Sequence, residues 1–207
     1  MANPDSGLPV KLRCLQNSTK EPVVGTDLES DLRSWSREVL EVANPYLGGL
    51  PPCPYAKQAW ANNKVSVVKT TNIYADALKF CSSFDGLGKE LVVLASYDLP
   101  ELSTFNEYVT QLNNIFPTLH CMEFHPEYGA DDAELDFLTD NDWESSVEAP
   151  YCMLFIQDLE LVVSASDKLK PLGYYKAYPT SEYEQLVLSR KRRLTNGYET
   201  SGYEKAC

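Results

Sequence analysis

Leu91-Val92-Val93-Leu94-Ala95 is the stretch that decides the fold, because it is short and apolar at every position. A strand with one solvated face alternates apolar and polar residues, whereas a strand covered on both faces is a continuous apolar run. The stretch therefore predicts a central strand that is buried on both faces of a sheet.

Strand and helix patterns alternate on both sides of this run. They predict further strands over 64–70, 119–124 and 151–156, and helices over 28–43, 72–84, 101–116, 159–169 and 181–194. This alternation predicts an α+β or α/β fold: a small three- or four-stranded sheet packed by helices, with a split-βαβ-like sandwich favoured and the strand order left open. The predicted divisions are a flexible lead-in (1–27), a core domain (28–170) with an acidic excursion (127–148), and a C-terminal helix and tail (171–207).

Charge is distributed unevenly along the 207 residues, whose net charge is −12. Residues 90–167 hold 17 Asp or Glu and no Lys or Arg, while the C-terminal segment is cationic. Such a middle segment repels phosphate backbones, so no nucleic-acid partner is predicted there. No apolar run approaches the ~18 residues of a membrane span, and the cysteines form no CxxC pair or regular framework, which favours a cytoplasmic protein without a membrane partner.

Cys53 is the strongest candidate for chemistry. Pro54 suits the first position of a helix, which would place Cys53 at the N-cap. There the free N–H groups and the helix dipole favour the thiolate, and Lys57, one turn further on, would add to the effect. The alternative is that the surrounding prolines only shape a tight loop with Cys53 packed beneath it.

His125 is the second candidate, because it directly follows a predicted strand, where α/β proteins place functional loops. It would act as the base that activates Cys53, as a metal ligand or as a proton donor. Strand alternation places His120 on the opposite face, so the two histidines are not expected to share a metal. A structural or exposed histidine is the alternative for both.

Three ordered motifs carry a family resemblance: Cys53-Pro54-Tyr55-Ala56, Phe124-His125-Pro126-Glu127-Tyr128 and Pro150-Tyr151-Cys152-Met153-Leu154. They resemble an uncharacterised, mostly bacterial family of unknown function whose members carry Cys-Pro-Phe-Ala, Phe-His-Pro-Asp-Tyr and Ser-Pro-Tyr-Pro-Met-Leu. The resemblance spans about residues 31–170 and implies Cys53 and His125 as paired positions, without implying a reaction. The tyrosines of the motifs, Tyr55, Tyr128 and Tyr151, are the candidate binding residues.

A second, local resemblance concerns Cys53-Pro54-Tyr55-Ala56 alone. It is similar to the active-site segment of glutaredoxins and of cysteine-type glutathione transferases, in which this segment opens a helix after a strand. Here Tyr46 to Pro52 is loop-like, and Ala56 stands where a resolving cysteine would be. Thiol chemistry of that kind is therefore the weaker interpretation.

Two functions from different classes follow. The first is an enzyme that uses Cys53 with His125 as a thiol nucleophile and base, or as a pair of metal ligands, on a small-molecule substrate. The second is a non-catalytic adaptor that docks a basic protein partner through 127–148, with a second contact from the C-terminal helix. The basic run Arg190-Lys191-Arg192-Arg193 is similar to a docking or import patch, but it is interpreted as complementing a helix end or pairing with the acidic segment. The sequence identifies no cofactor and no metal.

Overall fold

The computed structural model of the chain describes residues 27–127 and 149–203, with side chains described up to residue 196. The predicted lead-in, the acidic excursion after Glu127 and the end of the predicted tail lie outside these ranges. The described strands form a four-stranded sheet in the order β1-β2-β4-β3. They are β1 (Val65–Thr70), β2 (Leu91–Ser96), β3 (Leu119–Phe124) and β4 (Cys152–Asp158).

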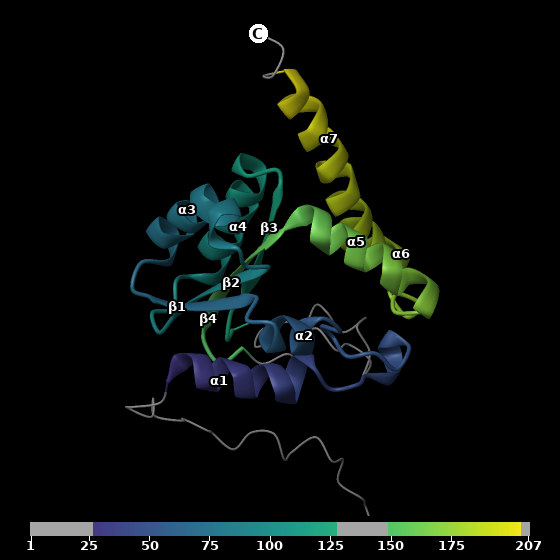
Figure 1. Ribbon diagram of the computed structural model, residues 1–207, viewed down its shortest axis with the longest axis horizontal. Coiled ribbons are helices and arrows are strands. Elements are labelled where there is room, and N and C mark those ends of the chain that lie inside the picture. The colour runs from purple at the N-terminus through teal and green to yellow at the C-terminus, as the bar shows by residue number, and fades with distance from the viewer. Residues whose placement is uncertain (1–26, 128–148, 204–207) are drawn as a thin grey trace, which may run out of the picture.

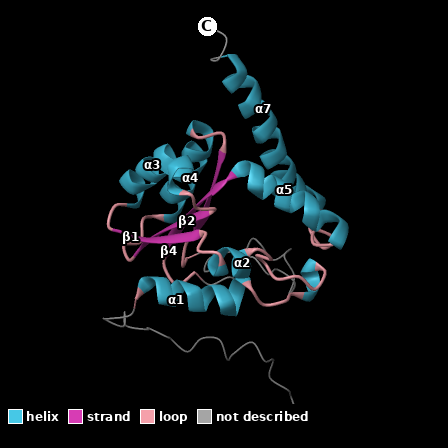
Figure 2. Ribbon diagram, in the orientation of Figure 1, coloured by secondary structure: helices cyan, strands magenta, loops and turns pink. Residues whose placement is uncertain are grey.

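Helices surround the sheet (Figures 1 and 2). Those of the N-terminal half are α1 (Leu28–Trp35), η2 (Ser36–Leu40), η3 (Pro45–Leu47), α2 (Ala56–Ala61), α3 (Ile73–Ser83), η4 (Phe84–Leu87) and α4 (Leu102–Ile115). Those of the C-terminal half are α5 (Leu159–Leu169), η6 (Lys170–Leu172), α6 (Thr180–Tyr183), η7 (Glu184–Leu188) and α7 (Ser189–Tyr203). None of the helices in the described part of the chain is long and apolar enough to span a membrane.

The sheet is mixed, which confirms the predicted α+β class. β1 and β2 are parallel, while β4 pairs antiparallel with both β2 and β3. β2 and β3 therefore run parallel to each other with β4 inserted between them, and α4 is the crossover that joins them. This is the split βαβ unit that the alternation of helices and strands favoured.

Each face of the sheet carries its own core. Val92 and Leu94 of β2 pack beneath α3 and α4, whereas Val93 and Ala95 pack against α1 and α2. Figure 1 shows these two helix pairs on opposite sides of the sheet. The central strand is thus buried on both faces, as its apolar run predicts.

Two predicted helix ends differ from the structure. The first helix stops at Leu40 rather than at 43, because it widens into the π-helical turn of η2, where Ser36 hydrogen-bonds the Glu41 carboxylate (2.9 Å). The last helical stretch runs from Thr180 to Tyr203 and passes through the predicted tail, and α7 projects from the body (Figure 1). Gly197 lowers helix propensity by about 1 kcal/mol but, unlike proline, removes no backbone donor, so it does not end the helix.

Candidate functional site

Cys53 lies in a tight turn ahead of α2. Its N–H donates to the Leu40 carbonyl (2.9 Å), and its carbonyl accepts from the Ala56 N–H (3.1 Å). The second bond closes a turn with Pro54 and Tyr55 at its corner, and proline favours the first corner position of such turns. The turn delays α2 to Ala56 with Tyr55 as its cap, so the prediction that Cys53 occupies the N-cap is wrong.

The Cys53 thiol is half-buried against the core of the α1 and α2 face. Burial raises its pKa, and the charge of the Glu41 carboxylate raises it further. Hydrogen bonds from the backbone N–H groups of Tyr55 and Ala56 lower the pKa but do not outweigh burial. The predicted thiolate is therefore wrong in direction: the folded chain holds Cys53 as a neutral thiol at pH 7.

Lys57 does not assist this thiol. It lies exposed on α2, and it is not among the groups that shift the Cys53 pKa. Tyr55, the predicted binding residue of the same motif, is 39 % exposed and presents its ring at the surface. Of the Cys53 motif, the tyrosine and the lysine are therefore open to a partner while the cysteine is largely covered.

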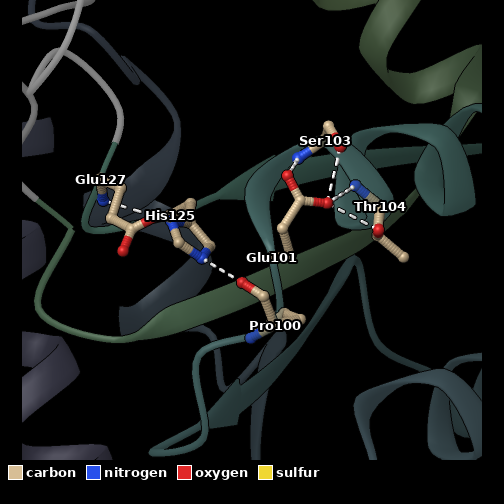
Figure 3. Close-up of polar contacts among 6 residues, drawn as sticks. All are labelled: Pro100, Glu101, Ser103, Thr104, His125 and Glu127. Carbon is tan, nitrogen blue, oxygen red and sulfur yellow. Dashed lines mark hydrogen bonds and ion pairs between the residues drawn. The ribbon is translucent and has the colours of Figure 1, made fainter.

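His125 is a buried clamp between two loops (Figure 3). Its Nδ1 accepts the Glu127 N–H (3.2 Å), so the proton of the neutral ring is on Nε2, which donates to the Pro100 carbonyl (3.0 Å). Pro100 belongs to the loop between β2 and α4, and His125 directly follows β3. Both ring nitrogens are thus engaged in joining these loops.

The structure does not bring Cys53 and His125 together. The His125 ring lies beside Phe105 of α4 (6.3 Å between centroids), in the core of the α3 and α4 face. Cys53 packs into the core of the other face. The sheet separates them, so the predicted nucleophile–base pair has no geometric support in this conformation.

Tyr151 links two elements at the start of β4. Its hydroxyl donates to the Asp31 carboxylate of α1 (3.1 Å), and its ring meets the Tyr97 ring edge-on (5.1 Å). Burial and the Asp31 carboxylate raise the Tyr151 pKa to about 12. Tyr151 is therefore occupied in holding α1 against the sheet. The third predicted binding residue, Tyr128, lies outside the described residues.

The basic run of α7 is tied to the body rather than placed at a helix end. Arg193 donates to the Leu119 carbonyl of β3 (2.7 Å), and Lys191 pairs with the exposed Asp167 of α5. Arg193 also approaches the buried His120 ring, whose pKa is held well below its ordinary range by burial and by the charges of Arg190 and Arg193. His120 therefore stays neutral and belongs to the contact that seats α7.

A surface that the sequence analysis missed forms around the Cys53 turn. Gly48 adopts a positive φ of 66°, and a Cβ there would lie 3.0 Å from the Leu172 carbonyl. The Tyr174 hydroxyl donates to the Pro52 carbonyl. These contacts bring two distant segments side by side, and we call the surface formed by residues 44–60 and 168–179 the tyrosine–lysine corner.

The corner differs in charge from the rest of the chain. Within its two segments the sequence has no Asp or Glu, although the chain as a whole has a net charge of −12. Its lysines are all exposed: Lys57, Lys168, Lys170 and Lys176.

Tyrosines supply the rest of the corner. Tyr46 and Tyr55 are exposed, and Tyr175 stacks edge-on against both Tyr174 (4.8 Å) and Tyr178 (5.2 Å). The sequence of each segment shows that it contains no Asp or Glu. Nothing in either segment, however, indicates that the two segments lie side by side.

The glutaredoxin-like and metal interpretations also gain no support from the geometry. β1, the first described strand, follows Cys53 and α2 instead of leading into them. Among the residues whose side chains the structure describes, no three His, Cys, Asp or Glu side chains gather closely enough to hold a metal ion. No described residue is therefore assigned as a ligand.

Comparison of the chain with family models, with curated proteins and with solved structures finds no match, so the three-motif resemblance stays a prediction.

Proposed function

We propose that the protein is a non-catalytic adaptor whose tyrosine–lysine corner docks an acidic segment of a partner protein. The observation that carries the proposal is the concentration of exposed lysines in two segments that lack any carboxylate, on a chain of net charge −12. A cationic patch attracts anionic segments of a partner through electrostatic complementarity.

The tyrosines suit such a role. A tyrosine ring offers a large contact area with few rotatable bonds, so it loses little conformational entropy when it binds, and its hydroxyl satisfies polar partners. Tyr55 and Tyr46, at 39 % and 42 % exposed, are free to cover apolar residues of a partner. The lysines would then pair with the partner's carboxylates at the rim.

The alternative of an enzyme built on Cys53 with His125 is less well supported. That function needs a thiol that ionises near neutral pH and a base within hydrogen-bond reach. Cys53 has a raised pKa. Both ring nitrogens of His125 are hydrogen-bonded to backbone groups, and the ring lies on the other face of the sheet from Cys53. The predicted docking of a basic partner through 127–148 lies outside the described residues beyond Glu127 and is not part of this proposal.

A charge-reversal experiment tests the adaptor. The probe is a fluorescent peptide that alternates Glu with Leu, titrated with the full chain at low salt. The corner variant carries Lys57→Glu and Lys170→Glu, and the control carries Lys69→Glu and Lys79→Glu, which are equally exposed lysines elsewhere. Each variant also removes cation–π contacts, because Lys170 of the corner pair and both lysines of the control pair lie over aromatic rings.

The corner variant is expected to bind the peptide roughly tenfold more weakly, given about 0.2–1 kcal/mol for each lost exposed pair and added repulsion. The control is expected to bind like the natural chain. Equal losses in both variants would show that only net charge matters and would overturn the proposal. Tighter binding of a single-stranded oligonucleotide than of the peptide would also overturn it, in favour of a nucleic-acid partner.

A further inference from the structure

Two buried cysteines on the α3 and α4 face lie side by side. Cys81 points inward from α3, Cys121 points inward from β3, and their sulfur atoms are 3.8 Å apart. They are 5 % and 2 % exposed, and both are free thiols. An S–S bond measures about 2.05 Å, so the sulfurs must approach by about 1.8 Å for a bond to form.

A cavity of about 300 Å³ lies on the Cys81 side of this pair. Cys81 is part of its wall, with Phe84, Phe116 and Leu119 as apolar neighbours and with Ser82 and Thr118 as polar ones. Cys121 is not part of the wall, so a small molecule in the cavity would lie closer to Cys81 than to Cys121. Cys53 and Cys152 do not line this cavity.

The two sulfurs have unequal roles. The hydrogen bond between the two sulfurs lowers the pKa of Cys81, whereas the same bond, together with burial, raises the pKa of Cys121. Thiolates react with peroxides and thiols do not, so Cys81, the member of the pair in the cavity wall, is the one expected to react first. The other sulfur is positioned to resolve the product.

We infer that Cys81 and Cys121 are a redox pair that small hydroperoxides convert to a disulfide. The Cys81 thiolate attacks the outer oxygen of the hydroperoxide, the O–O bond breaks, and an alcohol leaves with the proton released by Cys81. The resulting sulfenic acid of Cys81 is attacked by the Cys121 sulfur. The S–S bond forms, the S–O bond breaks, and water leaves with the Cys121 proton. Two thiols lose two electrons, and the hydroperoxide gains them.

This inference is independent of the adaptor proposal, because the pair and its cavity use none of the residues of the tyrosine–lysine corner. The expected consequence is structural. The disulfide would join the end of α3 to β3 and narrow the cavity, so an oxidising environment would stiffen the α3 and α4 face.

The test treats the reduced full chain with tert-butyl hydroperoxide, blocks remaining thiols with iodoacetamide and maps peptides without reduction. The expected product is the Cys81–Cys121 cross-linked peptide, formed at least tenfold faster than any modification of Cys152, which is buried in the same core. In Cys121→Ser, dimedone is expected to trap a sulfenic acid at Cys81. In Cys81→Ser, Cys121 is expected to stay unmodified.

A second variant tests whether the other four cysteines contribute to the cross-linking. It replaces Cys14, Cys53, Cys152 and Cys207 with Ser and keeps only the pair, and the cross-link is expected to form at an unchanged rate. Failure to cross-link in the natural chain would overturn the inference, as would cross-linking that begins only after denaturation. An equal rate for Cys81 and Cys152 would also overturn it, because the cavity would then confer no access.

Discussion

Cys53 and Cys81 lie on opposite faces of the same sheet, and the more exposed of the two is the weaker acid. Cys53 is half-buried in the turn ahead of α2, yet burial and Glu41 raise its pKa. Cys81 is 5 % exposed, yet the hydrogen bond with Cys121 lowers its pKa. The comparison teaches that a place near a helix start does not by itself make a cysteine acidic: burial dominates the pKa of Cys53, and the hydrogen bond with a neighbouring thiol dominates that of Cys81.

Replacement of His125 is expected to cause the largest loss of stability, because His125 joins two loops on the same face of the sheet as Cys81. His125→Ala removes a buried ring and leaves the Pro100 carbonyl and the Glu127 N–H without their partner. The free energy of unfolding is expected to fall by about 2–4 kcal/mol, which urea denaturation would measure.

Cys53→Ala is the matched control on the other face, and we expect a smaller loss of about 1 kcal/mol from a half-buried thiol. Unchanged stability in His125→Ala would contradict the structural role of His125 and would favour a catalytic one.

An intermediate effect is expected from pH at Cys53. Because its folded pKa is raised, folding keeps the thiol protonated, and the stability this provides is complete below the unfolded pKa of about 8.5. Stability is then lost as the pH rises above that value, by at most about 1.4 kcal/mol per pH unit from this group.

Urea denaturation of the natural chain and of Cys53→Ala at pH 7.5 and 9.5 isolates this contribution. All other titrating groups are present in both proteins, so their effects cancel in the comparison. The natural chain is expected to lose more stability between the two values than the variant does. A larger loss in the variant would mean that the folded state favours the thiolate, as the sequence first predicted.

The smallest effect is expected at Glu101, the N-cap of α4. Its carboxylate accepts from the hydroxyls and N–H groups of Ser103 and Thr104 (Figure 3), and these bonds lower its pKa to about 2. Its stabilising contribution is complete above the unfolded pKa of about 4.3 and is lost as the pH falls toward 2.

Glu101→Gln should therefore unfold at a lower temperature than the natural chain at pH 7, and the two melting temperatures should converge near pH 2. Glu160→Gln, on the first turn of α5, is the control for loss of a negative charge near a helix start. A gap between the Glu101 variant and the natural chain that persists at pH 2 would contradict a charge-dependent cap.

Much of the fold was predictable because it depends on local patterns. The apolar run at 91–95 identified the central strand, and helical spacing located α3 and α4 to within a residue or two of their bounds. These assignments succeed because side-chain periodicity reports which face of one element is buried. The predicted helix ends at 43 and 194 were wrong, and the observed ends are Leu40 and Tyr203. A π-helical turn and a tolerated glycine leave little trace in periodicity.

The candidate site was predictable only in part. The sequence singled out Cys53, His125 and Tyr55. The structure places Cys53 in a turn, His125 between two loops and Tyr55 at the surface. The predicted pairing of Cys53 with His125 is not supported, because the two lie on opposite faces of the sheet. Neither the tyrosine–lysine corner nor the Cys81–Cys121 pair was foreseen. Both join residues that are distant along the chain, and no local pattern says which distant residues meet.

By itself, the sequence determined that this chain folds as helices around a small sheet with one strand buried on both faces. That result follows from burying apolar side chains at periods that each segment carries within itself. Only the tertiary structure decided that β4 enters between β2 and β3, that Cys53 and His125 lie on opposite faces, and that Cys81 meets Cys121. Such contacts depend on how whole elements pack against one another, which is a property of the assembled core and not of any single segment.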